Sequence, residues 1–263
     1  MKLFHNNNSV CSQKVRVALA EKQLPWDSEH LDLSKNEQSS DEYMKLNPEG
    51  VVPTLVDGDM VLRESSVIAE YLDQLSDHNP LAPTAPRDLA TMHLWLTRAI
   101  EIHAAINSLT FATLMRQNQL RDSTPDEVKA KIAMFPNPQI RSKRLDLYSN
   151  GVNSPYVAGA LFTLKRMFDD MSVTLETADW LTAGQYGLSD IAVIAYVDRL
   201  DRLGMSGLWT ESYPKIDPWL RANQARPSYK IAIDDLIPAA AAERSRNVGE
   251  EAWPQIKSIW ESI

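Results

Sequence analysis

Short apolar runs alternate with stretches of helical spacing over the first 76 residues of the chain. The helical stretches end near Gln23, resume after Ser65, and include a polar segment over 36–46 that predicts an irregular surface helix. Asp57-Gly58-Asp59 is a hairpin turn signal between the last two apolar runs. The resulting order β-α-β-α-β-β-α is typical of an α/β unit. The predicted strands lie near 3–4, 26–31, 51–56 and 60–62.

A proline-rich segment separates this unit from the rest of the chain. Pro80, Pro83 and Pro86 lie close together, which indicates a linker. Beyond it nearly every stretch has helical spacing. We therefore expect an α/β domain over 1–77, a linker over 78–87 and an all-helical domain over 88–263. Helices are predicted over 89–120, 140–148, 156–175, 188–203 (the buried central helix) and 214–225, with a short amphipathic helix bearing Trp253, Ile256 and Trp260.

Composition narrows the classes of partner. The chain has 263 residues and a net charge of −8, so nucleic acid and anionic membranes are poor partners. Cys11 is the single cysteine, and the five histidines lack metal-ligand spacing, so neither a disulfide nor a metal site is expected. No apolar run approaches about 18 residues, and the start lacks a signal-peptide pattern. We expect a cytoplasmic protein.

The candidate chemistry lies where the first strand leads into the first helix. Ser9, Cys11 and Ser12 occupy this turn. Unpaired backbone N–H groups and the helix dipole favour an anion there, and they lower the pKa of a thiol. The alternative is that the serines cap the helix and Cys11 is a small buried hydrophobic residue.

Spaced motifs resemble those of a known family. Ser-x-Cys-Ser-x-Lys-x-Arg runs from Ser9 to Arg16, Asn-Pro-x-Gly-x-Val-Pro-Thr-Leu runs from Asn47 to Leu55, and Glu64-Ser65 directly precedes a predicted helix. In this order they resemble the glutathione S-transferase superfamily. The segment from Gly184 to Asp190 is similar to that family's capping box. The resemblance implies a thioredoxin-like α/β N-terminal domain followed by an all-α helical C-terminal domain.

The resemblance also implies a binding site for glutathione as cosubstrate. Val52, before what would be a cis Pro53, is similar to the residue whose backbone pairs with the cysteinyl part of glutathione. Glu64 and Ser65 resemble the pair that holds the γ-glutamyl end, with its carboxylate at a helix N-terminus. Helix capping is the structural alternative for this pair.

One position departs from the family's pattern. Where Val51 stands, the family often has Lys, Arg or Gln against the glycyl end of glutathione. Here Lys35 or Lys45 would have to supply that contact. The family generally pairs two chains about a twofold axis, so a homodimer is expected and a heterodimer is possible.

Subfamilies use different residues of the first turn, and three stay open. Ser9 aligns with the serine of the delta, theta and zeta classes. Cys11 aligns with the cysteine of zeta-type maleylacetoacetate isomerases and of tetrachlorohydroquinone reductive dehalogenase. Ser12 aligns with a serine of bacterial β-etherases. The common mechanism lowers the thiol pKa of bound glutathione through hydrogen bonds.

The leading hypothesis is a glutathione transferase that attacks an aromatic electrophile, by conjugation or by β-aryl ether cleavage of lignin-derived aromatics. Alternatives are reductive dehalogenation or other thiol–disulfide chemistry through Cys11, zeta-like isomerisation, and glutathione binding without turnover. In the helical half, His93 and His103 are expected to be structural, and Tyr156 and Phe162 are expected in the core because of their helical spacing.

Overall fold

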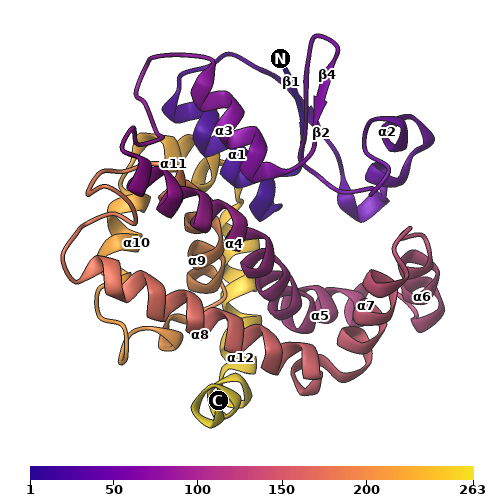
Figure 1. The fold of residues 1–263 in the computed structure, drawn as a ribbon. Coiled ribbons are helices and arrows are strands. Elements are labelled where there is room, and N and C mark those ends of the chain that lie inside the picture. Colours follow the sequence, from indigo (N-terminus) through magenta and orange to yellow (C-terminus); the bar gives the residue numbers. More distant parts are fainter.

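A four-stranded mixed sheet organises the amino-terminal part of the computed structural model, which describes all 263 residues (Figure 1). The strand order is β2-β1-β3-β4, with β1 parallel to β2 and antiparallel to β3. Leu3 of β1 pairs with Leu55 of β3, and both side chains are fully buried. The strands are β1 (Lys2–His5), β2 (Asp27–His30), β3 (Thr54–Asp57) and β4 (Met60–Leu62).

Helices α1 (Val10–Glu21) and α3 (Ser65–Gln74) pack against one another beside this sheet. The predicted irregular helix over 36–46 is a 3₁₀ turn, Glu37–Ser39, followed by α2 (Asp41–Leu46), and another 3₁₀ turn, Leu33–Lys35, precedes them. The strand predicted over 51–56 begins only at Thr54. The Val52–Pro53 peptide bond is cis, and a proline has no N–H to donate to a strand partner.

The remainder is helical, as predicted, with breaks at the prolines. The first predicted helix is divided by a π-helical segment, and a separate helix begins at Pro227. The helices are α4 (Pro86–Thr110), the π-helix Phe111–Met115, α5 (Arg116–Asp122), α6 (Pro125–Ala133), α7 (Pro138–Asn150), α8 (Pro155–Leu175), α9 (Leu188–Arg202), α10 (Ile216–Gln224), α11 (Pro227–Ala232) and α12 (Ala239–Ser262), with 3₁₀ turns at Gly151–Asn153, Ser206–Leu208 and Asp234–Leu236.

Helix α9 is the buried central helix, and the segment before it is fixed by backbone contacts. The Leu188 N–H donates to the Leu81 carbonyl at 3.0 Å. A Cβ on Gly187 would lie 2.4 Å from that carbonyl oxygen, so no larger residue fits without a shift. The Asp190 carboxylate accepts from the Gly187 N–H, as the capping-box resemblance implied, and also from the Trp219 indole.

Two sequence-based expectations about the helical part are wrong. The carboxy-terminal helix is not short: α12 spans 24 residues, because an alanine-rich run from Ala239 extends it well ahead of the tryptophans. Tyr156 and Phe162 are not in the core, since their side chains are 41% and 55% exposed. Helical spacing alone did not distinguish the inner from the outer side of α8. No helix is both long and apolar enough to span a membrane.

Candidate functional site

The turn between β1 and α1 positions three candidate side chains differently. Ser9 caps α1, and its hydroxyl accepts from the Ser12 N–H at 3.3 Å. Ser12 is fully buried, and its hydroxyl accepts from the Asn6 N–H at 3.4 Å. Cys11, in the first turn of α1, is only partly buried. Cys11 is therefore the one of the three that is partly accessible and whose side chain forms no hydrogen bond with the backbone of the turn.

Cys11 lies against groups from three other helices. His103 comes from α4, Tyr196 from α9 and Ser65 from the first turn of α3. Burial would raise the pKa of the Cys11 thiol, but the charge and hydrogen bond of His103 and the charge of Lys14 lower it to about 7. Burial would lower the pKa of His103, but the Cys11 thiolate raises it. The two groups stabilise each other as a thiolate and an imidazolium.

Lys14 connects the same four helices through hydrogen bonds. It is buried one turn after Cys11 on α1, and its ammonium donates to the Ser66 hydroxyl at 3.1 Å and to the Tyr196 hydroxyl at 3.4 Å. Ser66 in turn donates to the Leu96 carbonyl of α4. Burial lowers the pKa of Lys14, the charges of Cys11 and Glu64 oppose that shift, and no carboxylate lies within ion-pair distance. A buried cation at this point favours an anion nearby.

The residues around Pro53 are fixed by the motif that precedes it. Asn47 donates through its amide to the Val51 carbonyl at 2.8 Å and to the Thr54 hydroxyl at 3.1 Å. The Tyr43 hydroxyl donates to the same Val51 carbonyl at 2.5 Å. Val52 and Pro53 are buried. The Asn-Pro-x-Gly motif thus holds the backbone on both sides of the cis peptide.

The positions expected to hold the two ends of glutathione differ in their exposure to solvent and in their contacts. Glu64 precedes α3 as its N-cap and is exposed, while Ser65 opens the helix and is buried beside Cys11. Lys35 is exposed and lies 3.4 Å from a carboxylate oxygen of Asp32. No hydrogen bond or ion pair connects Lys35 to Val52, Glu64 or Ser65.

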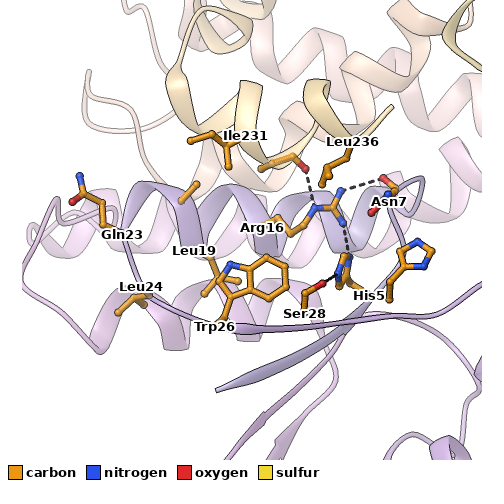
Figure 2. A pocket seen from close by; sticks show the side chains of 13 residues that line it. His5, Asn7, Arg16, Leu19, Gln23, Leu24, Trp26, Ser28, Ile231 and Leu236 are labelled. Carbon is orange, nitrogen blue, oxygen red and sulfur yellow. Dashed lines mark hydrogen bonds between the residues drawn. The ribbon is translucent and has the colours of Figure 1, made fainter. Parts of the chain in front are cut away.

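A separate cavity of about 650 Å³ is lined by residues of α1, β2 and α11 (Figure 2). Arg16 is the charged group at its centre. The guanidinium donates to the Ala232 carbonyl at 2.8 Å and to the Asn6 and Asn7 carbonyls at 3.1 Å. None of the residues that line this cavity belongs to the Cys11 cluster. Arg16 therefore binds the backbone carbonyls of the β1–α1 turn and does not belong to the Cys11 cluster.

Sequence reasoning missed His103 and Tyr196. His103 was expected to be structural; instead its imidazole faces Cys11, whereas His93 forms a surface pair with Glu70 at 2.8 Å. Both histidines lie on α4, and nothing local in the sequence separates them. Their difference arises from how α4 packs against the amino-terminal part.

Comparisons with known proteins identify relatives in sequence and in fold. Residues 8–75 match the glutathione S-transferase N-terminal domain family. The chain is 29% identical over 238 residues to protein LigF of Sphingobium sp. strain SYK-6, covering 88% of this chain and 91% of LigF. The crystal structure of beta-etherase LigF superposes with a TM-score of 0.78 over 89% of this chain and 98% of that one, at 27% identity. The chain thus resembles the glutathione S-transferase superfamily over most of its length, and residues 8–75 match that family's N-terminal domain.

Other relatives match over a shorter range. A stringent starvation protein A homolog of Haemophilus ducreyi is 40% identical over 97 residues, and glutathione S-transferase Z1 of Arabidopsis thaliana is 42% identical over 89 residues. These alignments span 44% and 39% of the two relatives, so the chain aligns with less than half of their length. The shared part covers 35% and 34% of this chain.

Proposed function

We propose that this protein is a glutathione transferase that directs the glutathione thiolate at an aromatic electrophile, with β-aryl ether cleavage of lignin-derived aromatics as its reaction. The observation that carries the proposal is the likeness to beta-etherase LigF, which extends over nine-tenths of the chain in sequence and in fold. The helical half decides the second substrate, and the likeness includes that half. The alignments with other relatives, of 97 and 89 residues, are too short to cover the helical half.

Glutathione would be held by the amino-terminal part. The backbone of Val52, before the cis Pro53, pairs with the cysteinyl unit, and Glu64 and Ser65 hold the γ-glutamyl end at the amino end of α3. Its sulfur then lies near the first turn of α1. Lys14 is buried and forms no ion pair, although the charge of Glu64 acts on it, and together with the dipole of α1 it favours the thiolate.

The reaction balances without another cofactor. The thiolate of glutathione attacks the carbon that bears the aryloxy group, a C–S bond forms, and the C–O bond breaks with its electron pair on the departing phenolate. The phenolate takes one proton. His103, whose imidazole faces the first turn of α1, is the proposed donor on the enzyme.

A second candidate rests on Cys11 itself, because its thiol has a pKa of about 7 and partial solvent access. In this reaction the Cys11 thiolate attacks the sulfur of a glutathionyl adduct, and an S–S bond forms. The C–S bond breaks, and the carbon leaves as a carbanion that takes up a proton. A second glutathione then reduces the mixed disulfide and is released as glutathione disulfide. The outcome is reductive removal of the glutathionyl group.

A single assay separates these possibilities. Loss of glutathione thiol is followed with a β-aryl ether ketone, a chlorinated hydroquinone and maleylacetone, using the wild type, Cys11→Ala, Ser9→Ala and Ser12→Ala. Consumption of one glutathione per ether cleaved, nearly unaffected by Cys11→Ala, supports the transferase. Accumulation of the glutathionyl adduct in Cys11→Ala, with a mixed disulfide found by mass spectrometry in the wild type, supports the second candidate.

Two further outcomes would replace the proposal. Isomerisation of maleylacetone with no net loss of glutathione identifies a zeta-like isomerase. Glutathione binding by calorimetry with no turnover of any compound identifies a binding protein. We further propose a homodimer, which sedimentation velocity tests directly. Because a heterodimer is the alternative, the assays are run only on preparations whose oligomeric state has been measured.

A further inference from the structure

Two neighbouring cations on α7 lack acidic partners in a chain of net charge −8. The Arg144 guanidinium lies between two aromatic rings, 4.1 Å from the centroid of Phe111 and 3.9 Å from that of Phe135. It forms no ion pair and no hydrogen bond with the protein. Lys143 donates only to the Ala104 carbonyl, at 3.1 Å. Burial lowers the pKa of Arg144 to about 10, so it stays charged at neutral pH.

This pair is connected to the Cys11 cluster through α4. The Lys143 charge acts on His103, which faces Cys11. Ala104, which Lys143 contacts, is the next residue along α4, and Phe111 lies two helical turns beyond His103. The two cations therefore follow α4 away from His103, with Lys143 beside Ala104 and Arg144 beside Phe111.

The helical backbone changes its geometry at Phe111. Helix α4 passes at Phe111 into a π-helical segment that ends at Met115. An added residue in one turn changes the direction of the following side chains, and such segments are frequent at functional sites. The π-helix also contacts α7 and α12. Figure 1 shows α6 and α7 projecting from the helical bundle beside the segment that bears α2, and Asn36 there contacts the Met134 sulfur at 3.7 Å.

We propose that Arg144, assisted by Lys143, binds a carboxylate or phenolate group of the aromatic second substrate. The inference rests on the proposed transferase function and specifies its substrate class. Arg144 keeps its charge and its N–H donors unpaired, while the two rings hold its plane fixed, and such a guanidinium pairs an anionic oxygen with little loss of side-chain entropy. A purely structural role would require only the stack between Phe111 and Phe135.

The test compares two electrophiles of similar shape that carry either an anionic or a neutral group on the ring: 4-chloro-3-nitrobenzoate and 4-chloro-3-nitrobenzamide. Arg144→Met keeps an apolar stem between the rings and removes the charge. Lys131→Met removes one exposed, unpaired cation from the neighbouring α6 and is the matched control. We expect Arg144→Met to lower kcat/KM for the benzoate at least tenfold, through KM, and to change the benzamide less than twofold. Lys131→Met should change neither.

An equal fall in kcat/KM for both electrophiles would assign Arg144 a structural role and overturn the inference. An unchanged kcat/KM for both would also overturn it. The inference remains testable if the protein turns over neither compound, an outcome that counts against the proposed function alone. Calorimetry then measures binding of the two glutathione conjugates, one with a carboxylate and one with a carboxamide on the ring. Tighter binding of the carboxylate conjugate that Arg144→Met abolishes supports the inference, and equal binding by the wild type overturns it.

Discussion

Cys11 and His103 face each other across the junction of α1 and α4, one residue from each half of the chain. The imidazole lowers the pKa of the thiol to about 7, and the thiolate raises the pKa of the imidazole. Each group thus depends for its charge on the docking of the other half. The reactivity of the single cysteine is consequently a property of the assembled fold.

The first prediction concerns this pair. In His103→Gln the thiol loses its cationic neighbour, and its pKa should rise toward the ordinary value of about 8.5. The thiolate fraction at pH 7 then falls on the order of tenfold, and alkylation by iodoacetamide slows by the same factor. The pH dependence of the alkylation rate measures this, with a midpoint near pH 7 expected in the wild type. His93→Gln is the control, and an unchanged midpoint in His103→Gln would contradict the assignment.

Arg16 is predicted to maintain the β1–α1 turn. Its guanidinium donates to the carbonyls of Asn6, Asn7 and Ala232. Burial first, and then the Arg16 charge, lower the pKa of His5 to about 4, so His5 is neutral and its Nδ1 accepts from Arg16. Arg16→Met leaves these buried acceptors without a donor and should cost about 2–4 kcal/mol of unfolding free energy. Urea denaturation measures the loss.

The matched control for that change is Arg87→Met, which removes an exposed arginine near the start of α4. It should stay within about 0.5 kcal/mol of the wild type. A loss in Arg16→Met no larger than in this control would show that solvent satisfies the turn carbonyls and that Arg16 does not support it.

Gly249 is predicted to be indispensable for docking α12. A Cβ on Gly249 would lie 1.7 Å from the Leu203 carbonyl oxygen at the end of α9. Gly249→Ala should therefore displace α12, expose Ile256 and Trp260, and lower the unfolding free energy by at least about 2 kcal/mol. Gly159→Ala on α8 meets no neighbouring atom and should instead stabilise slightly, by up to about 1 kcal/mol. Thermal unfolding and limited proteolysis of the two variants distinguish these outcomes.

The Glu21–Arg226 pair predicts a pH-dependent stability. Glu21 accepts from Arg226 at 2.7 and 2.9 Å and also from Ser228. Burial would raise the pKa of Glu21, but the hydrogen bonds of Arg226 and Ser228 lower it below 4.5. A lowered carboxyl pKa stabilises the fold above the unfolded pKa, and this contribution is lost as the pH falls through the folded pKa.

Arg226→Gln should therefore lower the free energy of unfolding by about 2–3 kcal/mol at pH 7. This figure is reduced because the Arg226 side chain is 28% exposed. The loss should be smaller below pH 4.5, where Glu21 becomes protonated. Arg221→Gln, at a more exposed pair with Asp201, should cost no more than about 1 kcal/mol. Urea denaturation at pH 7 and pH 4 measures both variants. A deficit in Arg226→Gln that does not shrink at pH 4 would contradict the pairing.

Much of the fold follows from the sequence because its signals are local. The period of the apolar residues indicated the strands and helices, and the Asp57-Gly58-Asp59 turn indicated the β3–β4 hairpin. The failures came where packing decided the result. Helix α12 is longer than its apolar stripe, and the exposure of Phe162 depends on what α8 packs against.

The candidate site likewise has a part that local sequence signals predict and a part that packing decides. The residue types and spacing from Ser9 to Arg16, and of Glu64-Ser65, predicted by themselves that a turn capped by Ser9 precedes α1 and that another helix begins at Ser65. That the turn binds an anion stays a prediction. Only the tertiary structure decided that His103 and Tyr196 reach Cys11. Those contacts join positions about 90 to 190 residues apart, and a side chain's pKa depends on neighbours in space that no local pattern specifies.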